Sequence, residues 1–232
     1  MILRNILTLL CIFFLFGCQQ FSGAIKSIST GQLNNVVVIS VSGLGSKPTG
    51  LKELEDKIKT ECPTATLIQS HWTHDLEKEL EVWDGQKPLI IVSHSFGGGR
   101  SVYLTQRLFF AGKKVNILYL LDPVPPPVEK PDNSLDFTLL QNIKFAECWN
   151  RDMWQPFVAS SEPIQNLNDG NGNWKNYVVH EFHNDIPSDL GIQTKIIDGI
   201  QNSAKIQLGL PLPNLSQLLT VDPKAKNLKI KK

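Results

Sequence analysis

The most constraining feature of this chain is the junction at Ser95, where one sequence pattern gives way to another. The apolar run Leu89–Val92 has the length and β-branched content of a buried strand, and from Phe96 onward the apolar residues recur at helical spacing. Ser95 is therefore predicted to occupy a tight turn from a strand into a helix. A serine at such a turn presents its hydroxyl at the positive end of the helix, beside backbone N–H groups that can hold a developing oxyanion.

The segment around this serine reads Ser-His-Ser-Phe-Gly-Gly from Ser93 to Gly98. It resembles the nucleophile elbow of the α/β-hydrolase superfamily, whose commonest form is Gly-His-Ser-x-Gly-Gly. Gly97 meets the need for a small residue two positions after the serine, and Ser93 meets the equivalent need before it only approximately. The resemblance implies an α/β-hydrolase fold, with a mostly parallel sheet, helices on both faces and a small or absent lid, and Ser95 as nucleophile. The alternative is a polar turn with Ser95 as helix N-cap.

The N-terminus has the pattern of a secretory signal. Arg4 precedes an apolar core, Ile6–Phe16, that is too short for a permanent membrane span of about 20 residues. The segment Leu15–Cys18 that ends it resembles the lipobox of bacterial lipoproteins. The resemblance implies removal of residues 1–17, attachment of lipid such as palmitate to Cys18, and, since Gln19 is not aspartate, export to the outer membrane, facing the periplasm or the cell surface. The alternative is an ordinary signal cleaved at a later small residue.

The remaining chain is predicted to form one domain. Residues 18–33 are expected to be a tether, residues 34–210 the α/β-hydrolase domain, and residues 211–232 a tail with prolines and lysines. With 41% hydrophobic and 19% charged residues, the composition is that of a globular protein, and a net charge of +1 gives no reason to expect nucleic acid as a partner. Cys62 and Cys148 are predicted to lie on opposite sides of the sheet, so no disulfide between them is expected.

The loop after the first strand is the predicted second part of an oxyanion hole. Asn35–Ser42 is so continuously apolar that it is predicted to be a central parallel strand, and a glycine-rich segment follows it. In α/β-hydrolases the corresponding loop donates a backbone N–H, and the resemblance assigns this role to Leu44, with the N–H of Phe96 as the other donor. The alternative is a glycine-rich turn between a strand and a helix.

Further helices are predicted over Thr49–Thr60, with Thr49 as N-cap, over Asp75–Trp83 and over Ser188–Asn202. Between the first two, His71 and His74 lie near the end of a predicted strand. Such histidines line pockets in some proteins but are more often simple surface or packing residues.

The triad acid has two candidates. Asp122 follows the apolar strand Val115–Leu121 and precedes a proline run that stiffens its loop, so its carboxylate would face the same rim of the sheet as Ser95. Asp152, after the strand-like Ile143–Trp149, is the competitor, and a plain turn residue is the alternative for Asp122. Asp122 is favoured.

The general base also has two candidates, His180 and His183. The base must stand on the loop after the last strand, which is predicted to include Tyr177–Val179, and His183 lies in that loop whereas His180 still belongs to the strand. We favour His183, which gives the chain order Ser95, Asp122, His183 that α/β-hydrolases share.

These residues together predict a serine hydrolase of the carboxylesterase or lipase type, acting on small esters or lipids. The mechanism requires no metal or organic cofactor. An acyltransferase or a thioesterase would use the same residues. The competing hypothesis is a lipoprotein that binds through a hydrolase scaffold without chemistry, because fold does not fix function.

Overall fold

The computed structural model describes residues 35–45, 47–125, 138–139, 142–152, 165–166 and 174–209. The predicted signal peptide, Cys18, the tether and the C-terminal tail lie outside these residues, as do most of the segments in which a lid would be sought. Among the described helices, none is long and apolar enough to cross a membrane.

The centre of the fold is a six-stranded sheet in the order β2-β1-β3-β4-β6-β8, in which every neighbouring pair is parallel. In chain order its strands are β1 (Val36–Ser42), β2 (Ala65–His71), β3 (Leu89–His94), β4 (Val115–Leu121), β6 (Ile143–Arg151) and β8 (Trp174–Val179). A separate two-residue parallel pair joins β5 (Thr138–Leu139) to β7 (Gln165–Asn166).

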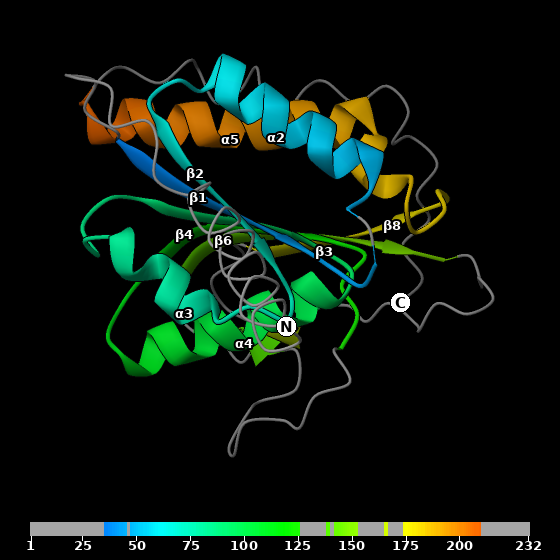
Figure 1. The fold of residues 1–232 in the computed structure, drawn as a ribbon, viewed down its shortest axis with the longest axis horizontal. Helices are drawn as coiled ribbons and strands as arrows, with labels where there is room; N and C mark the ends of the chain where they lie inside the picture. Colours follow the sequence, from blue (N-terminus) through cyan, green and yellow to red (C-terminus); the bar gives the residue numbers. More distant parts are fainter. Residues whose placement is uncertain are drawn as a thin grey trace, which may run out of the picture. The chain divides into compact units, whose positions relative to one another are not determined.

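Helices cover both faces of this sheet. They are α2 (Thr49–Glu61), α3 (Leu76–Glu79), the 3-10 turn η1 (Leu80–Val82), α4 (Phe96–Phe110), the 3-10 turn η2 (Ile186–Ser188) and α5 (Leu190–Gln207). Figure 1 shows α2 and α5 on one face and α3 and α4 on the other. The predicted α/β architecture, a parallel sheet between two layers of helices, is confirmed.

Each layer has its own apolar core, as the alternation of side chains along a strand requires. On the α2 and α5 face, Val38 of β1 packs with Leu54 and Ile196. On the opposite face, Ile39 packs with Trp83 and Leu104. Cys62 belongs to the first core and Cys148 to the second, and both are free and buried, so their predicted placement on opposite sides of the sheet is confirmed.

The predicted central strands are also confirmed. β1 and β3 are buried at every position, because they lie in the middle of the sheet with helices above and below. The residues that end these strands, and those that end β4, β6 and β8, all face one edge of the sheet because all the strands run the same way. That edge holds every predicted catalytic residue.

The helix boundaries differ from the predicted ones. Thr49 is the first residue of α2 and Pro48 precedes it, so Thr49 is not the N-cap. The stretch from Asp75 to Trp83 has only one α-turn before it tightens into η1, with the Asp75 side chain capping the start. α5 begins two residues later than predicted, because Pro187 lies in η2 and Asp189 caps the helix by accepting from the N–H of Ile192.

Candidate active site

Ser95 stands at the corner between β3 and α4 in a strained backbone conformation, with φ 59° and ψ −131°. Three backbone hydrogen bonds hold the corner. The N–H of Ser95 donates to the carbonyl of Leu121 at 3.2 Å, and its carbonyl accepts from the N–H groups of Gly98 at 2.8 Å and Val124 at 3.0 Å. The Ser95 side chain makes no capping hydrogen bond to the helix, which argues against a plain N-cap role.

Small residues surround this corner for a steric reason. A Cβ on Gly97 would collide with the carbonyl oxygen of Val41, so α4 approaches β1 as closely as the sequence pattern predicted. Ser93 stands where the usual elbow has glycine. It is fully buried, and its hydroxyl donates to the carbonyl of Tyr119 at 3.4 Å, so the structure accommodates this departure.

The loop after β1 lies directly against Ser95. A Cβ on Gly43 would stand 2.5 Å from the Ser95 Cβ and 2.8 Å from its Oγ. Leu44, the next residue, has a side chain that is largely exposed. Phe96 is the first residue of α4, where a backbone N–H has no partner within the helix. The two segments predicted to donate to an oxyanion thus flank the serine.

Asp122 and His183 are in direct contact. His183 Nδ1 lies 2.5 Å from Asp122 Oδ2, and both side chains are buried. Asp122 directly follows β4 with a positive φ of 47°, and its N–H donates to the carbonyl of Trp149 on β6 at 2.8 Å. The two residues that the sequence analysis favoured as acid and base are therefore brought together beside the Ser95 corner.

The two competing residues pair with each other instead. His180 Nδ1 lies 2.8 Å from Asp152 Oδ2 at the carboxy ends of β8 and β6. This pair is solvent-exposed, at 81% for the histidine side chain and 39% for the aspartate. An exposed pair is screened by water, whereas a buried pair keeps its geometry and its electrostatic effect. The environment therefore favours Asp122 and His183 for acid and base roles.

His94 is a member of the site that the sequence analysis did not single out. It precedes Ser95, and its Nε2 lies 2.8 Å from the carbonyl oxygen of His183, with the two rings 4.4 Å apart. Since a carbonyl only accepts, Nε2 carries the proton and donates. Burial, and then the charge of His183, lower the pKa of His94 to about 4. His94 is therefore neutral at physiological pH and holds the backbone of the candidate base.

Arg151 is the second residue that sequence reasoning missed. It ends β6, its Nη1 donates to Asp122 Oδ2 at 2.8 Å, and its backbone N–H donates to Asp122 Oδ1 at 3.3 Å. Its side chain is only 4% exposed. In the sequence, Arg151 is a single charged residue shortly after the predicted strand Ile143–Trp149, and no pattern around it indicates that it pairs with Asp122.

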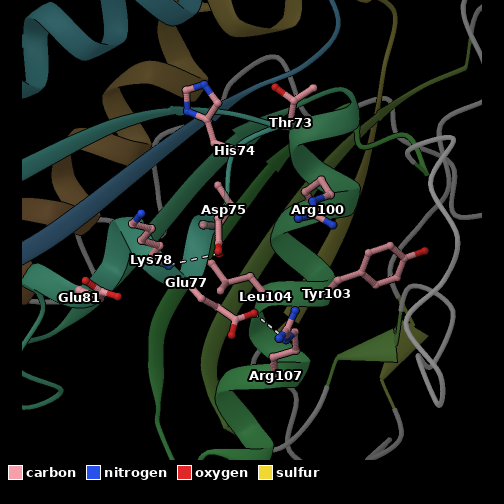
Figure 2. Close-up of a pocket in the computed structure, with 11 residues that line it drawn as sticks. Thr73, His74, Asp75, Glu77, Lys78, Glu81, Arg100, Tyr103, Leu104 and Arg107 are labelled. Atoms are coloured by element: carbon pink, nitrogen blue, oxygen red, sulfur yellow. Dashed lines mark hydrogen bonds and ion pairs between the residues drawn. The ribbon is translucent and has the colours of Figure 1, made fainter. Parts of the chain in front are cut away.

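A cavity of about 580 Å³ lies along α3 and α4. Figure 2 shows residues that line it, among them His74, Arg100, Tyr103 and Arg107. None of the predicted catalytic residues lines it. His74 reaches it while bonded to Glu79 at 2.8 Å, and His71 lies outside its lining, with Nδ1 2.8 Å from the Thr73 hydroxyl. Both histidines thus have ordinary surface partners.

A metal centre is not evident in the part of the chain that the structure describes, where no group of three or more histidine, cysteine or acidic residues is arranged to hold an ion.

Comparison with known proteins gives similarity at the level of the fold alone. No family model and no curated protein matches the chain. Among solved structures, one similar chain is a presumed hydrolase of the alpha/beta superfamily from Xanthomonas campestris pv. campestris, 14% identical, with a TM-score of 0.42 over 75% of this chain and 99% of that one. Another is a cutinase-like protein from Cryptococcus sp., 15% identical, with a TM-score of 0.41 over 79% of this chain and 100% of that one.

Proposed function

We propose that this protein is a serine hydrolase that cleaves carboxylic esters, with Ser95 as nucleophile, His183 as general base and Asp122 as the acid that orients it. One observation carries the proposal. Ser95, at a strained strand-to-helix corner, is hydrogen-bonded through its backbone to Leu121 and Val124, which flank Asp122, and Asp122 is bonded to the buried His183. Residues from three distant parts of the chain converge there at one rim of a parallel sheet, which is where such folds bind ligands.

The chemistry follows from the protonation states. An ionised Asp122 only accepts hydrogen bonds, so His183 Nδ1 carries a proton toward it, and Nε2 has the lone pair that a general base needs. His183 takes the proton of Ser95 as the hydroxyl attacks the ester carbonyl, and the N–H groups of Leu44 and Phe96 hold the oxyanion. The imidazolium then protonates the leaving alcohol. Water repeats the sequence on the acyl-enzyme and releases the acid.

The substrate class is a small carboxylic ester or a lipid. A p-nitrophenyl ester series of increasing acyl length is the direct test, with turnover in the absence of added metal as the expected result. Transfer of the acyl group to another alcohol, and thioester hydrolysis, would use the same residues and are distinguished by supplying those acceptors and substrates. A folded protein inactive on all of them would favour the non-catalytic scaffold.

The acid is tested by paired substitutions. Asp122→Asn is expected to lower kcat by about 10⁴-fold, because the amide favours the wrong histidine tautomer. Asp152→Asn removes the same charge from the exposed pair with His180 and is expected to leave kcat within a factor of about two. Loss of turnover in Asp152→Asn alone would contradict the assignment.

We also propose that the chain is an exported lipoprotein anchored through Cys18, on the sequence pattern alone. Growth with a labelled palmitate analogue is expected to label the wild-type protein but not the Cys18→Ser variant. Labelled protein is expected in the outer-membrane fraction. Equal absence of label from both proteins would contradict the lipid anchor.

A further inference from the structure

The carboxylate of Asp122 accepts more hydrogen bonds than the one that the proposed mechanism needs. Its Oδ2 accepts from His183 Nδ1 at 2.5 Å and from Arg151 Nη1 at 2.8 Å. Its Oδ1 accepts from the Arg151 backbone N–H at 3.3 Å. The acid is therefore fixed by the base on one side and by the last residue of β6 on the other.

Burial makes this arrangement energetically important. Asp122 is fully buried and the Arg151 side chain is 4% exposed, so neither charge is well solvated. A buried carboxylate without a cation would favour its neutral form, and a protonated acid would no longer orient the base. Arg151 neutralises the carboxylate while leaving its Oδ2 available to His183.

We propose that Arg151 is a positioning residue of the active site, which holds Asp122 ionised and in place to orient His183. This inference rests on the proposed hydrolase function. It gives Arg151 an effect on the geometry of the acid, which determines the rate at the plateau of the pH–rate profile.

The test is the pH–rate profile of kcat/KM for Arg151 variants on an activated ester. In Arg151→Met the plateau is expected to fall by about 10-fold or more as Asp122 loses its anchor, and the downfield proton resonance of His183 Nδ1 is expected to shift. Arg151→Lys keeps the charge and loses the fixed fork of donors, so it should recover only part of the plateau.

Two controls keep the outcomes distinct. Arg107→Met breaks an exposed ion pair with Glu77 and removes the same charge far from Asp122, so the wild-type profile is expected. If Arg151→Met does not fold, Arg151→Gln provides a neutral side chain with a remaining donor, and the downfield proton resonance of His183 Nδ1 reports the change without turnover.

An Arg151→Met or Arg151→Gln protein that is folded, with an unchanged plateau and an unchanged Nδ1 resonance, would overturn the inference. Failure of the proposed function would look different. Wild-type protein would then show no ester turnover at any pH, while the Nδ1 resonance would still respond to Arg151 if Arg151 positions the pair.

Discussion

Ser95 and Asp122 are the two residues other than glycine with positive φ in the described part of the chain, at 59° and 47°. Such conformations cost about 1–3 kcal/mol each and persist only where the surroundings fix them. Here the fixing groups are backbone partners from neighbouring strands, Leu121 for Ser95 and Trp149 for Asp122. Strained residues of this kind cluster at functional sites, so the two positive φ values at the same edge of the sheet support the proposed site.

The contact between Gly43 and Ser95 gives a residue-scale prediction. Gly43→Ala would put a methyl group 2.8 Å from the Ser95 hydroxyl oxygen, so either the serine or the oxyanion loop must move. We expect kcat/KM to fall by about 100-fold or more, the effect of losing an oxyanion donor. The atoms nearest to the added methyl group are those of Ser95 and the His94 carbonyl, so we expect the rest of the sheet to be unaffected and the thermal midpoint of unfolding to change by only a few degrees.

The matched control is Gly85→Ala, at a turn where an added Cβ meets nothing within 4 Å. Its φ of +76° makes alanine strained there, so a stability loss of about 1 kcal/mol is expected with normal activity. Equal activity of the Gly43→Ala and Gly85→Ala proteins would show that the loop after β1 does not serve the nucleophile.

Burial of His94 predicts a pH dependence of stability. Its pKa of about 4 in the folded protein is below the ordinary 6.5, so the unfolded chain binds a proton between these values while the native protein does not. The free energy of unfolding therefore falls as pH falls through this window. Between pH 7.5 and pH 5 the contribution is about 2 kcal/mol.

Denaturant titrations at these two pH values measure that difference. His94→Gln retains an amide that can donate to the His183 carbonyl but does not titrate, so its free energy of unfolding should depend less on pH than that of the wild type. Parallel pH dependence in the two proteins would mean that His94 is protonated in the native state.

At the scale of elements, strands were easier to predict than helix ends. Val115–Leu121 was predicted at its observed bounds, because a run of seven residues that is apolar except for Asn116, between turn signals, fits a buried strand. The predicted helix beginning at Ser188 instead starts at Leu190, because Asp189 accepts from the N–H of Ile192 and caps it. Ser188 and Asp189 are both short polar residues that could begin this helix. Only the packing of the preceding turn, η2, decides which of them caps it.

The packing of α5 on β4 gives a prediction at this scale. A Cβ on Gly199 would collide with the Tyr119 hydroxyl, so the helix lies against the sheet as closely as glycine allows. Gly199→Ala is expected to destabilise the fold by about 1–3 kcal/mol through overpacking, which outweighs the roughly 1 kcal/mol that alanine gains in helix propensity.

The double variant Gly199→Ala with Tyr119→Phe tests the cause, since it removes the colliding hydroxyl. Much of the lost stability should return in denaturant titrations of the double variant. Simple addition of the two single effects would show that the helix and the strand do not interact at this point.

At the scale of the whole molecule, the sequence predicted the architecture. Continuous apolar runs separated by helical stretches indicate a parallel sheet, and the residues that end its strands then share an edge. Asp122 was selected in this way, Ser95 by the elbow pattern and His183 by its place in the loop after the last strand, and their catalytic roles stay predictions. What could not be predicted were the contacts of Arg151 with Asp122, 29 residues away, and of His94 with His183, 89 residues away. Neither pair has a local pattern, because strand order and register bring them together.

The most direct test of the account is labelling of the intact protein with a fluorophosphonate probe, which reacts with a serine hydroxyl only when a base and an oxyanion hole activate it. The account predicts one labelled peptide, carrying the probe on Ser95, with labelling abolished in the Ser95→Ala protein and in the His183→Ala protein. A folded protein that takes up no probe, or one labelled equally after His183→Ala, would contradict it.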